Sequence, residues 1–554
     1  MKKIILLFFF IFSSLLSFSS HFMGGELTWI CLKGGPNVGQ YVFELKVYRD
    51  CDGITFSQTA LTVTQHNYPT LGATSPILMN FISVSDISPV GYSSGASTSC
   101  FDCAGITGAA LGAVEEYIWR SDPIAFAGNP PPEGWHFIWG GGTRSGQITN
   151  ILTPNSQSWT LRAVMYPYDS DPTPAINYLA SSPCYDSSPR FKELAKTIIC
   201  TGYPFAYSHN ASDDELDELT YSWAEPLGEW AAYDPNNPNA TALPFIAPYT
   251  FDLPIPGNPT LDSETGEIAY NSSTAGVFVT CVKVEARKCG QLVAEIYREV
   301  QVALLDCNAF SPPVDGLNDP PVVSAPIGPQ VWLTTINSAG LPSYETTVFA
   351  GDLVQFNIEA EDFDSYAGGI DQNITLNISG GQVSGDYILP NFCANPPCAT
   401  FNDGSGSNPP VTPGLNGTSL FAPVIVNGFF EWQTSCSHIY ADGGVSCNAT
   451  SNIFNFFIKA YDDFCPANGV GVANIKITVV PPIPDLRCVS VKDNGDIDLT
   501  WQYLANTPPT TEPVFVWHAT SFLGPYTIID SVLFPIDIYT HLGANGNAVS
   551  QFYF

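Results

Sequence analysis

The sequence predicts an all-β protein built from tandem immunoglobulin-like β-sandwich domains. Three observations predict this fold class: apolar and polar residues alternate along many short segments, turn residues separate those segments, and one alternating block occurs twice. Alternation with a period of two is typical of strands that bury one face. A length of 554 residues corresponds to about three to five such domains.

The clearest predicted strand pair lies between residues 261 and 307. One face carries Lys283, Glu285 and Arg287, and the other carries the apolar residues Phe278, Val282, Val284 and Ala286. A second alternating run, residues 299–304, follows after a Cys-Gly pair, so the two runs predict an antiparallel hairpin. Gly266 lies in DSETGEI, where a tight turn needs a residue that tolerates positive φ.

The same pattern recurs near Cys465. Aligning Cys289 with Cys465 places Lys283 on Lys459, and an acidic stretch precedes each copy. The chain is therefore expected to use one sandwich-like unit at least twice, in an array that spaces and presents binding surfaces.

Turn-rich and proline-rich segments divide the chain. The predicted divisions are a signal peptide (1–20), an N-terminal sandwich-like domain (21–180), two cadherin/PKD-like sandwich repeats (181–310 and 311–482) and a fibronectin type III-like domain (483–554). Lys2 and Lys3 precede an unbroken apolar run and then small residues, which is the order of an export signal. We expect the proline-rich segment 311–326 to act as a semi-extended spacer. The last domain stops where its sixth strand would run, and we interpret the chain as truncated.

Composition narrows the function classes. The formal charge is −33, which repels nucleic acid. The 15 cysteines suit an oxidising, extracellular compartment. Cys31 and Cys51 bracket one strand and are expected to clip it to its neighbour. The candidate disulfide cysteines are Cys31, Cys51, Cys184, Cys200, Cys436 and Cys447.

Signals for catalysis are absent from the sequence. The 7 histidines occur singly, and no HExxH, GxSxG or phosphate-cradling glycine loop is present. The single CxxC, at Cys100 and Cys103, is more typical of structural disulfides than of a redox or metal site. We therefore predict that the protein is not an enzyme.

Acidic strand ends suggest a cation site. Asp362 and Asp364 precede one strand of the second repeat, and Asp462 and Asp463 end another, so these carboxylates could meet at one pole. Four such oxygen ligands suit Ca²⁺, in an arrangement that resembles cadherin-like modules; the alternative is a solvated acidic loop.

The first repeat differs at this pole. It offers Asp213, Asp214 and Asp217, but Arg287 aligns with Asp463. We expect Arg287 to pair with Asp213 or Asp214 as a built-in cation.

The N-terminal motif carries a resemblance. The sequence has His21, Gly24, Gly25 and Glu26, and a following strand ends in Tyr-Arg-Asp-Cys at residues 48–51. This segment resembles the start of large secreted Bacteroidota proteins of the gliding-motility-associated, type IX secretion type. The resemblance continues through SSPRF at residues 187–191. It departs at residues 141–144, where a family Cys-Cys-Arg-Asn element is missing.

Together these features predict a non-catalytic, exported cell-surface structural or adhesion protein, which the resemblance links to gliding. Its partners would be cell-surface or extracellular proteins or glycans, and outer-membrane association would come only through a C-terminal region beyond Phe554. The alternative is a carbohydrate-binding accessory protein or the non-catalytic part of a secreted hydrolase. Five tryptophans form either a sugar-stacking platform or buried core: Trp135, Trp139, Trp223, Trp230 and Trp432.

Overall fold

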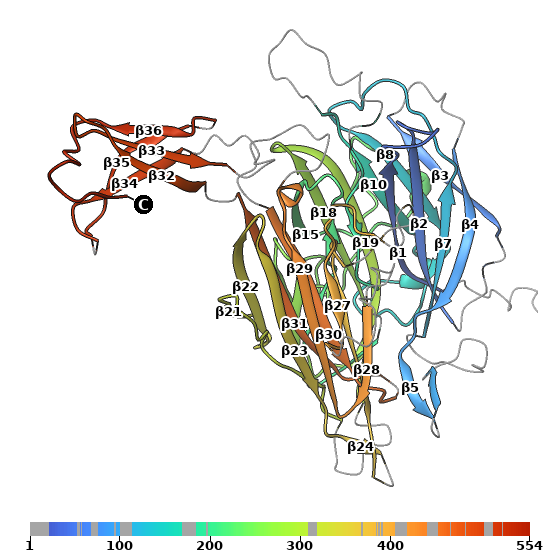
Figure 1. The fold of residues 1–554 in the computed structure, drawn as a ribbon. Coiled ribbons are helices and arrows are strands. Elements are labelled where there is room, and N and C mark those ends of the chain that lie inside the picture. Colours follow the sequence, from blue (N-terminus) through green and yellow to red (C-terminus); the bar gives the residue numbers. More distant parts are fainter. Residues whose placement is uncertain are drawn as a thin grey trace, which may run out of the picture.

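The computed structural model describes residues 21–553 except 52–55, 57, 68–75, 94–95, 100–112, 169–183, 185, 196–197, 308–317, 367–368, 384, 386–387, 389–391, 405–417, 440–451, 466, 482–483, 504–512, 523 and 534. Regular structure in this part is β-strand, apart from short 3₁₀ turns at η1 (Pro154–Ser156), η2 (Trp230–Ala232) and η4 (Cys436–His438). The predicted all-β class is therefore confirmed (Figure 1). The predicted signal peptide lies outside the described residues.

The N-terminal strands form one curled sheet in the order β10-β8-β3-β4-β7-β2-β1. Their bounds are β1 (His21–Cys31), β2 (Tyr41–Asp50), β3 (Ala60–His66), β4 (Ile77–Asp86), β7 (Val114–Ser121), β8 (Trp135–Gly141) and β10 (Trp159–Met165), and the short strands here are β5 (Val90–Ser93), β6 (Ala96–Ser99) and β9 (Thr143–Arg144). Both end strands of the sheet, β10 and β1, pair with β19 (Gln291–Leu305).

Strand β19 closes this sheet from far along the chain. One edge of β19 pairs along its length with β18 (Gly276–Lys288). The other edge pairs with β10 at Ile296 and then with β1 at Val300. The hydrogen-bonded sheet thus runs across the predicted boundary at residue 180. One hydrophobic core follows the same path, from Phe22 to Leu304.

The remaining strands of this region complete the first sandwich. They are β11 (Arg190–Phe191), β12 (Ile198–Cys200), β13 (Pro204–Ser208), β14 (Ala211–Ser212), β15 (Glu218–Trp223), β16 (Thr260–Leu261) and β17 (Glu267–Asn271). The predicted hairpin is confirmed, since Lys288 pairs with Gln291 around a two-residue turn whose Cys289 and Gly290 both have positive φ. Gly266 also has the predicted positive φ, at 67°.

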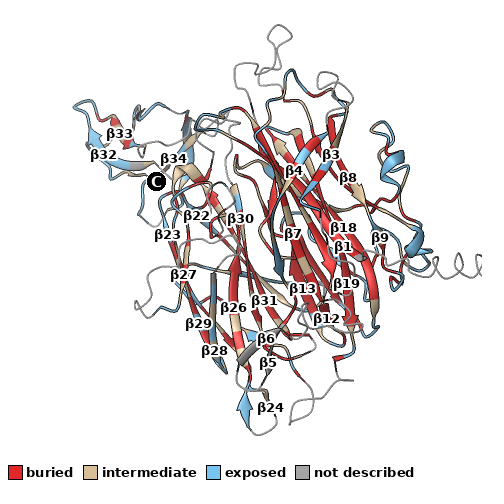
Figure 2. Cartoon of the chain, turned by 90° about the vertical axis from the view of Figure 1, so that its right-hand side faces the viewer, coloured by how far each residue is buried: buried red, intermediate tan, exposed pale blue. Residues whose placement is uncertain are grey.

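Strands β13 and β17 of the sheet β13-β17-β16 are buried on both faces. Phe205 and Tyr207 point into the first core, whereas Ala206 and Ala269 pack against the second sandwich, at Phe457 and Val472. The period of two along a strand separates these two sets of side chains. Small side chains on the second face let the two sandwiches approach closely, and Figure 2 shows buried strands in both of them.

The second sandwich lies lengthwise beside the first (Figure 1). Its sheets are β20-β23-β29-β27 and β21-β22-β31-β30-β26-β28. Strand bounds are β20 (Val322–Val323), β21 (Leu333–Ile336), β22 (Pro342–Phe349), β23 (Leu353–Glu361), β24 (Ser365–Tyr366), β25 (Ile370–Asp371), β26 (Asn373–Ser379), β27 (Thr400–Asn402), β28 (Thr418–Pro423), β29 (Ile425–Gln433), β30 (Asn452–Tyr461) and β31 (Val470–Val480). Hairpin β30–β31 is the expected counterpart of β18–β19.

Polar contacts fix the two sandwiches to each other. Lys459 pairs with Glu193, and Lys476 pairs with Glu264 at 3.0 Å. The described part of the predicted spacer is not extended between domains, because Val322 and Val323 pair with β23 and Ile327 bridges to Asn357. The spacer prediction is therefore wrong for residues 322–324: backbone hydrogen bonding makes them part of the second sandwich.

The C-terminal region is a separate small sandwich that projects from the rest in Figure 1. Its sheets are β32-β33-β36 and β35-β34-β37. Strand bounds are β32 (Asp485–Val491), β33 (Ile497–Gln502), β34 (Val514–Ala519), β35 (Thr527–Val532), β36 (Ile538–His541) and β37 (Phe552–Tyr553). Trp501 lies in its core, as a strand tryptophan predicts.

Candidate functional site

The N-terminal motif lies where β1 pairs with β19 in the sheet. A Cβ atom on Gly24 would overlap the carbonyl oxygen of Glu299, and one on Gly25 would lie 2.5 Å from the carbonyl oxygen of Lys46. Gly24 also has φ of 143°. The two glycines are therefore required by close backbone approach on both sides of β1.

Glu26 and Arg298 are paired and buried at the contact between β1 and β19. The Arg298 guanidinium pairs with Glu26, donates to the Glu193 carbonyl oxygen at 2.8 Å and lies 4.1 Å from the Phe191 ring centroid. Burial raises the pKa of Glu26, but the charges of Arg298 and Lys46 outweigh it and hold that pKa below its usual value. The motif residues thus have a structural role: they stabilise the pairing of β1 with β19.

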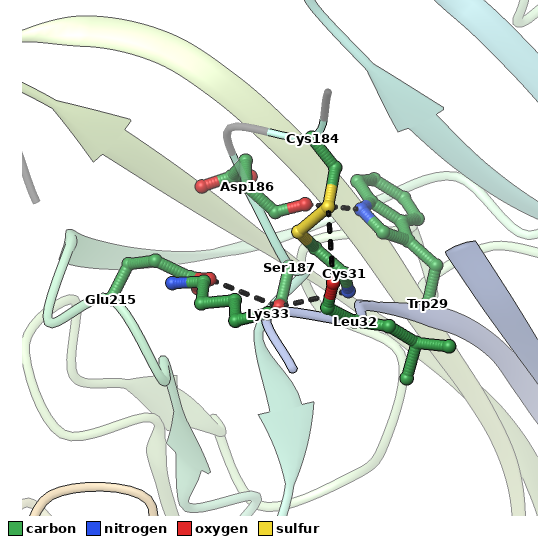
Figure 3. Close-up of a disulfide and its surroundings, with 8 residues drawn as sticks. All are labelled: Trp29, Cys31, Leu32, Lys33, Cys184, Asp186, Ser187 and Glu215. Atoms are coloured by element: carbon green, nitrogen blue, oxygen red, sulfur yellow. Dashed lines mark hydrogen bonds and ion pairs between the residues drawn. A yellow bond between two sulfur atoms is a disulfide. The ribbon is translucent and has the colours of Figure 1, made fainter. Parts of the chain in front are cut away.

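The SSPRF segment, residues 187–191, packs against the same strand, β1. Ser188 Oγ accepts a hydrogen bond from the Trp29 backbone N–H at 2.9 Å, and Ser187 Oγ accepts one from that of Cys31 at 3.1 Å. Figure 3 shows the Cys31–Cys184 disulfide next to the Ser187 contact, and the Trp29 indole donates to the Asp186 carbonyl oxygen at 3.3 Å. These bonds hold Cys184 and residues 186–188 against the end of β1.

A cluster of carboxylates surrounds a buried lysine beside this disulfide. We call it the first acidic pole: Asp186, Asp213, Glu215 and Asp217 around Lys288, with Lys33 at its edge. Lys288 Nζ lies 2.8 Å from Asp217 Oδ2 and 3.4 Å from Asp186 Oδ1. Lys33 Nζ lies 2.5 Å from Glu215 Oε1, an ion pair visible in Figure 3.

Burial decides the protonation of this pole. Asp186 is fully buried, and no hydrogen bond from a described residue reaches either oxygen of its carboxyl group. Burial raises the pKa of both Asp186 and Asp213 well above the usual value, which favours the neutral acid. The negative charge that Asp186 and Asp217 carry when ionised more than offsets the burial of Lys288 and raises its pKa.

The predicted built-in cation exists, but it is Lys288 and not Arg287. Arg287 pairs with Glu285 at 2.9 Å, and its side chain is 38% exposed. The period of two explains the correction, because Arg287 shares the outer face with Lys283 and Glu285, whereas Lys288 shares the buried face with Ala286.

The four aspartates of the predicted calcium site lie at one end of the second sandwich. Asp462 Oδ2 accepts from Asn318 Nδ2 at 2.7 Å, and Asp463 Oδ1 accepts from the Tyr366 hydroxyl at 2.8 Å. Asp364 Oδ2 accepts from the Asp319 backbone N–H at 2.7 Å. Asp362 Oδ1 accepts from the Asp364 backbone N–H at 2.9 Å. We call these four residues the second acidic pole.

Asp362 is the least satisfied member of the second acidic pole. It is 5% exposed, and its Oδ2 receives no hydrogen bond from a described residue. Burial raises its pKa to about 7, and burial also raises that of Asp462 well above the usual value. Among the described residues, no three His, Cys, Asp or Glu side chains are grouped to hold a metal ion. Calcium binding thus stays a prediction.

The disulfide pairing differs from the expected one. Cys31 pairs with Cys184, so the predicted Cys31–Cys51 clip is wrong, although Cys51 is itself disulfide-bonded. Cys200 pairs with Cys307, and Cys393 pairs with Cys398. Cys436, a predicted disulfide cysteine, is a free thiol. Cys447 lies outside the described residues. Spacing alone does not determine connectivity, because partners far apart in sequence meet only in the fold.

The candidate sugar platform does not form as one surface. Trp135, Trp139 and Trp432 are buried, and Trp223 is half-buried. Only Trp230 of the five is exposed, at 41%.

Sequence reasoning missed several residues of these sites, and a signal in the sequence could have found two of them. Arg298 and Lys288 both occupy inward positions of strands whose other inward residues are apolar, such as Ile296 and Val284. A charged residue at such a position predicts a buried ionic partner. Nothing local in the sequence identified Asp186.

Comparisons with known proteins found no matching family model and no matching curated protein. Solved structures that match include domains A168–A170 of titin (TM-score 0.18, 11% identity, covering 67% of this chain and 92% of that one). The extracellular domains 3–5 of Drosophila OTK match with a TM-score of 0.17 and 10% identity, covering 66% of this chain and 95% of that one. The FN1–FN3 domains of chicken CNTN1 match with a TM-score of 0.13 and 8% identity, covering 64% of this chain and 87% of that one. Similarity at these TM-scores carries no argument about function. The described residues contain no helix with the length and apolarity of a bilayer span.

Proposed function

We propose that the protein is a non-catalytic structural or adhesion component of the bacterial cell surface, of the Bacteroidota type exported for gliding. The observation that supports this proposal best is that buried charged side chains of the protein pair with one another. Buried pairs such as Arg298–Glu26 and Arg144–Glu299 join strands that lie far apart in sequence. The disulfides support export to an oxidising compartment. Two sandwiches fixed side by side would form a stiff unit that carries a binding surface.

Deletion of the gene in its gliding host tests this proposal. We expect weaker surface adhesion and slower spreading, with secreted hydrolase activities unchanged. Complementation with the full chain should restore both properties, and antibody should label that chain on intact cells. Loss of a hydrolase activity with normal adhesion would contradict the proposal.

Calcium at the second acidic pole is the second part of this proposal. The unpaired Oδ2 of Asp362, buried beside other carboxylates, supports it. Calorimetric titration of the full chain with CaCl₂ at pH 8 should give binding that Asp362→Asn abolishes. Asp213→Asn, in the pole that already holds Lys288, is the matched control and should leave binding intact. Equal binding by both variants, or no heat from the unmodified chain, would reject the site.

The carbohydrate-binding alternative depends on Trp230, which is exposed on η2. A glycan array probed with the full chain and with Trp230→Ala separates the two functions. Binding that disappears in the variant supports a lectin role, whereas an empty array leaves the structural role.

A further inference from the structure

We propose that Lys288 and Asp217 form an intramolecular amide cross-link in the folded protein, with Asp186 as the proton donor. This inference concerns a covalent modification site and is independent of the proposed cell-surface function.

Strand pairing brings the two reacting groups together. Glu218 on β15 pairs with Arg287 on β18, so Asp217 and Lys288 are the next cross-strand neighbours at the end of this ladder. Lys288 Nζ lies 2.8 Å from Asp217 Oδ2 and 2.9 Å from Asp217 Oδ1. Both side chains are buried, with exposures of 8% and 5%. Such proximity supplies much of the effective concentration that amide formation requires.

Asp186 supplies the third group. Its Oδ1 lies 3.4 Å from Lys288 Nζ, and neither of its oxygens accepts a hydrogen bond from a described residue. Burial raises the pKa of this carboxyl group, which favours the neutral acid that can donate a proton. Asp213 positions the loop, because its Oδ1 accepts from the backbone N–H groups of Glu215 and Asp217 at 2.9 and 3.2 Å.

The reaction balances without any other reagent. The resting pair is ionic, and a proton moves from the Lys288 ammonium to the Asp217 carboxylate with no change in net charge. The amine lone pair then forms a C–N bond to Asp217 Cγ, while the carbonyl electron pair moves to oxygen and takes the Asp186 proton. The C–OH bond breaks, water leaves with a proton from nitrogen, and Asp186 recovers its own proton. One ammonium and one carboxylate give one neutral amide and one water.

Intact mass spectrometry of the folded, exported chain, after reduction and alkylation, tests the cross-link. We expect a mass lower than that of the sequence by one water, and a branched tryptic peptide that joins the Asp217 segment to an uncleaved Lys288. Lys288→Arg and Asp217→Ala should both keep their full mass. Asp217→Asn should lose ammonia and reach the same cross-linked product.

Two further variants separate the roles. Lys33→Arg removes no reacting group and should cross-link fully. Asp186→Asn should leave an uncross-linked fraction that persists over days. An unmodified mass in the native chain would overturn the cross-link, and complete reaction of Asp186→Asn would overturn the role of Asp186.

Discussion

The guanidinium of Arg298 pairs with the carboxylate of Glu26 across 272 residues of sequence. This pair joins the first described strand to the strand that closes its sheet. It lies on opposite sides of the boundary that sequence patterns place at residue 180. The first two predicted domains therefore depend on one shared set of buried contacts.

Breaking the Arg298–Glu26 pair should be strongly destabilising. Glu26→Gln leaves a buried guanidinium without its counter-charge, at a cost of about 3 to 5 kcal/mol. The double variant Glu26→Leu/Arg298→Met removes both charges and should recover most of that loss. Urea unfolding, followed by tryptophan fluorescence, measures both. A double variant no more stable than Glu26→Gln would show that the pair has little to do with the loss.

Gly24→Ala should destabilise the pairing of β1 with β19. The added methyl group overlaps the Glu299 carbonyl oxygen, and relief requires the backbone of β1 or β19 to move, at about 3 kcal/mol. Gly34→Ala is the matched control, because nothing lies within 4 Å of its Cβ position. Thermal melting of both variants gives the comparison, and equal melting temperatures would contradict the close-approach explanation.

Enlarging Ala269 should loosen the two sandwiches without unfolding either. Ala269 is 1% exposed and packs towards the second sandwich, so Ala269→Leu overpacks the interface by about 1 to 3 kcal/mol. Small-angle scattering should report a longer particle, and proteolysis should release the second sandwich. The exposed Ala232→Leu serves as control. An unchanged scattering profile would mean that the interface absorbs the extra volume.

The second acidic pole should make stability fall as pH rises. The folded pKa of Asp362 is raised to about 7 from a usual value of 3.8, so between these values the folded state binds the extra proton. Its stabilising contribution is full below about pH 4 and is lost as pH rises through about 7. With divalent cations chelated, Asp362→Asn should match the unmodified protein at pH 4 and melt higher at pH 8. The same melting difference at both pH values would contradict this assignment.

Local sequence patterns predicted local structure in this protein, but they did not predict contacts between residues far apart in sequence. The period of two predicted the β18–β19 hairpin and placed Lys283 and Glu285 on its outer face, since burial acts residue by residue. The same period places Arg287 on the outer face. The prediction that Arg287 pairs with Asp213 or Asp214 followed its alignment with Asp463 instead, and was wrong. The pairing of Cys31 with Cys184 could not be predicted, because spacing does not encode which cysteines meet. The closure of the N-terminal sheet by β19 could not be predicted either, because alternation along a strand does not encode which distant strand it pairs with.

That closing strand has a consequence for the order in which the molecule assembles. A nascent chain that has emerged only as far as residue 165 has every N-terminal strand but leaves two sheet edges open, because β19 comes later. Contacts of such high sequence separation form slowly. We therefore expect the first sandwich to complete its folding only after β19 has left the ribosome.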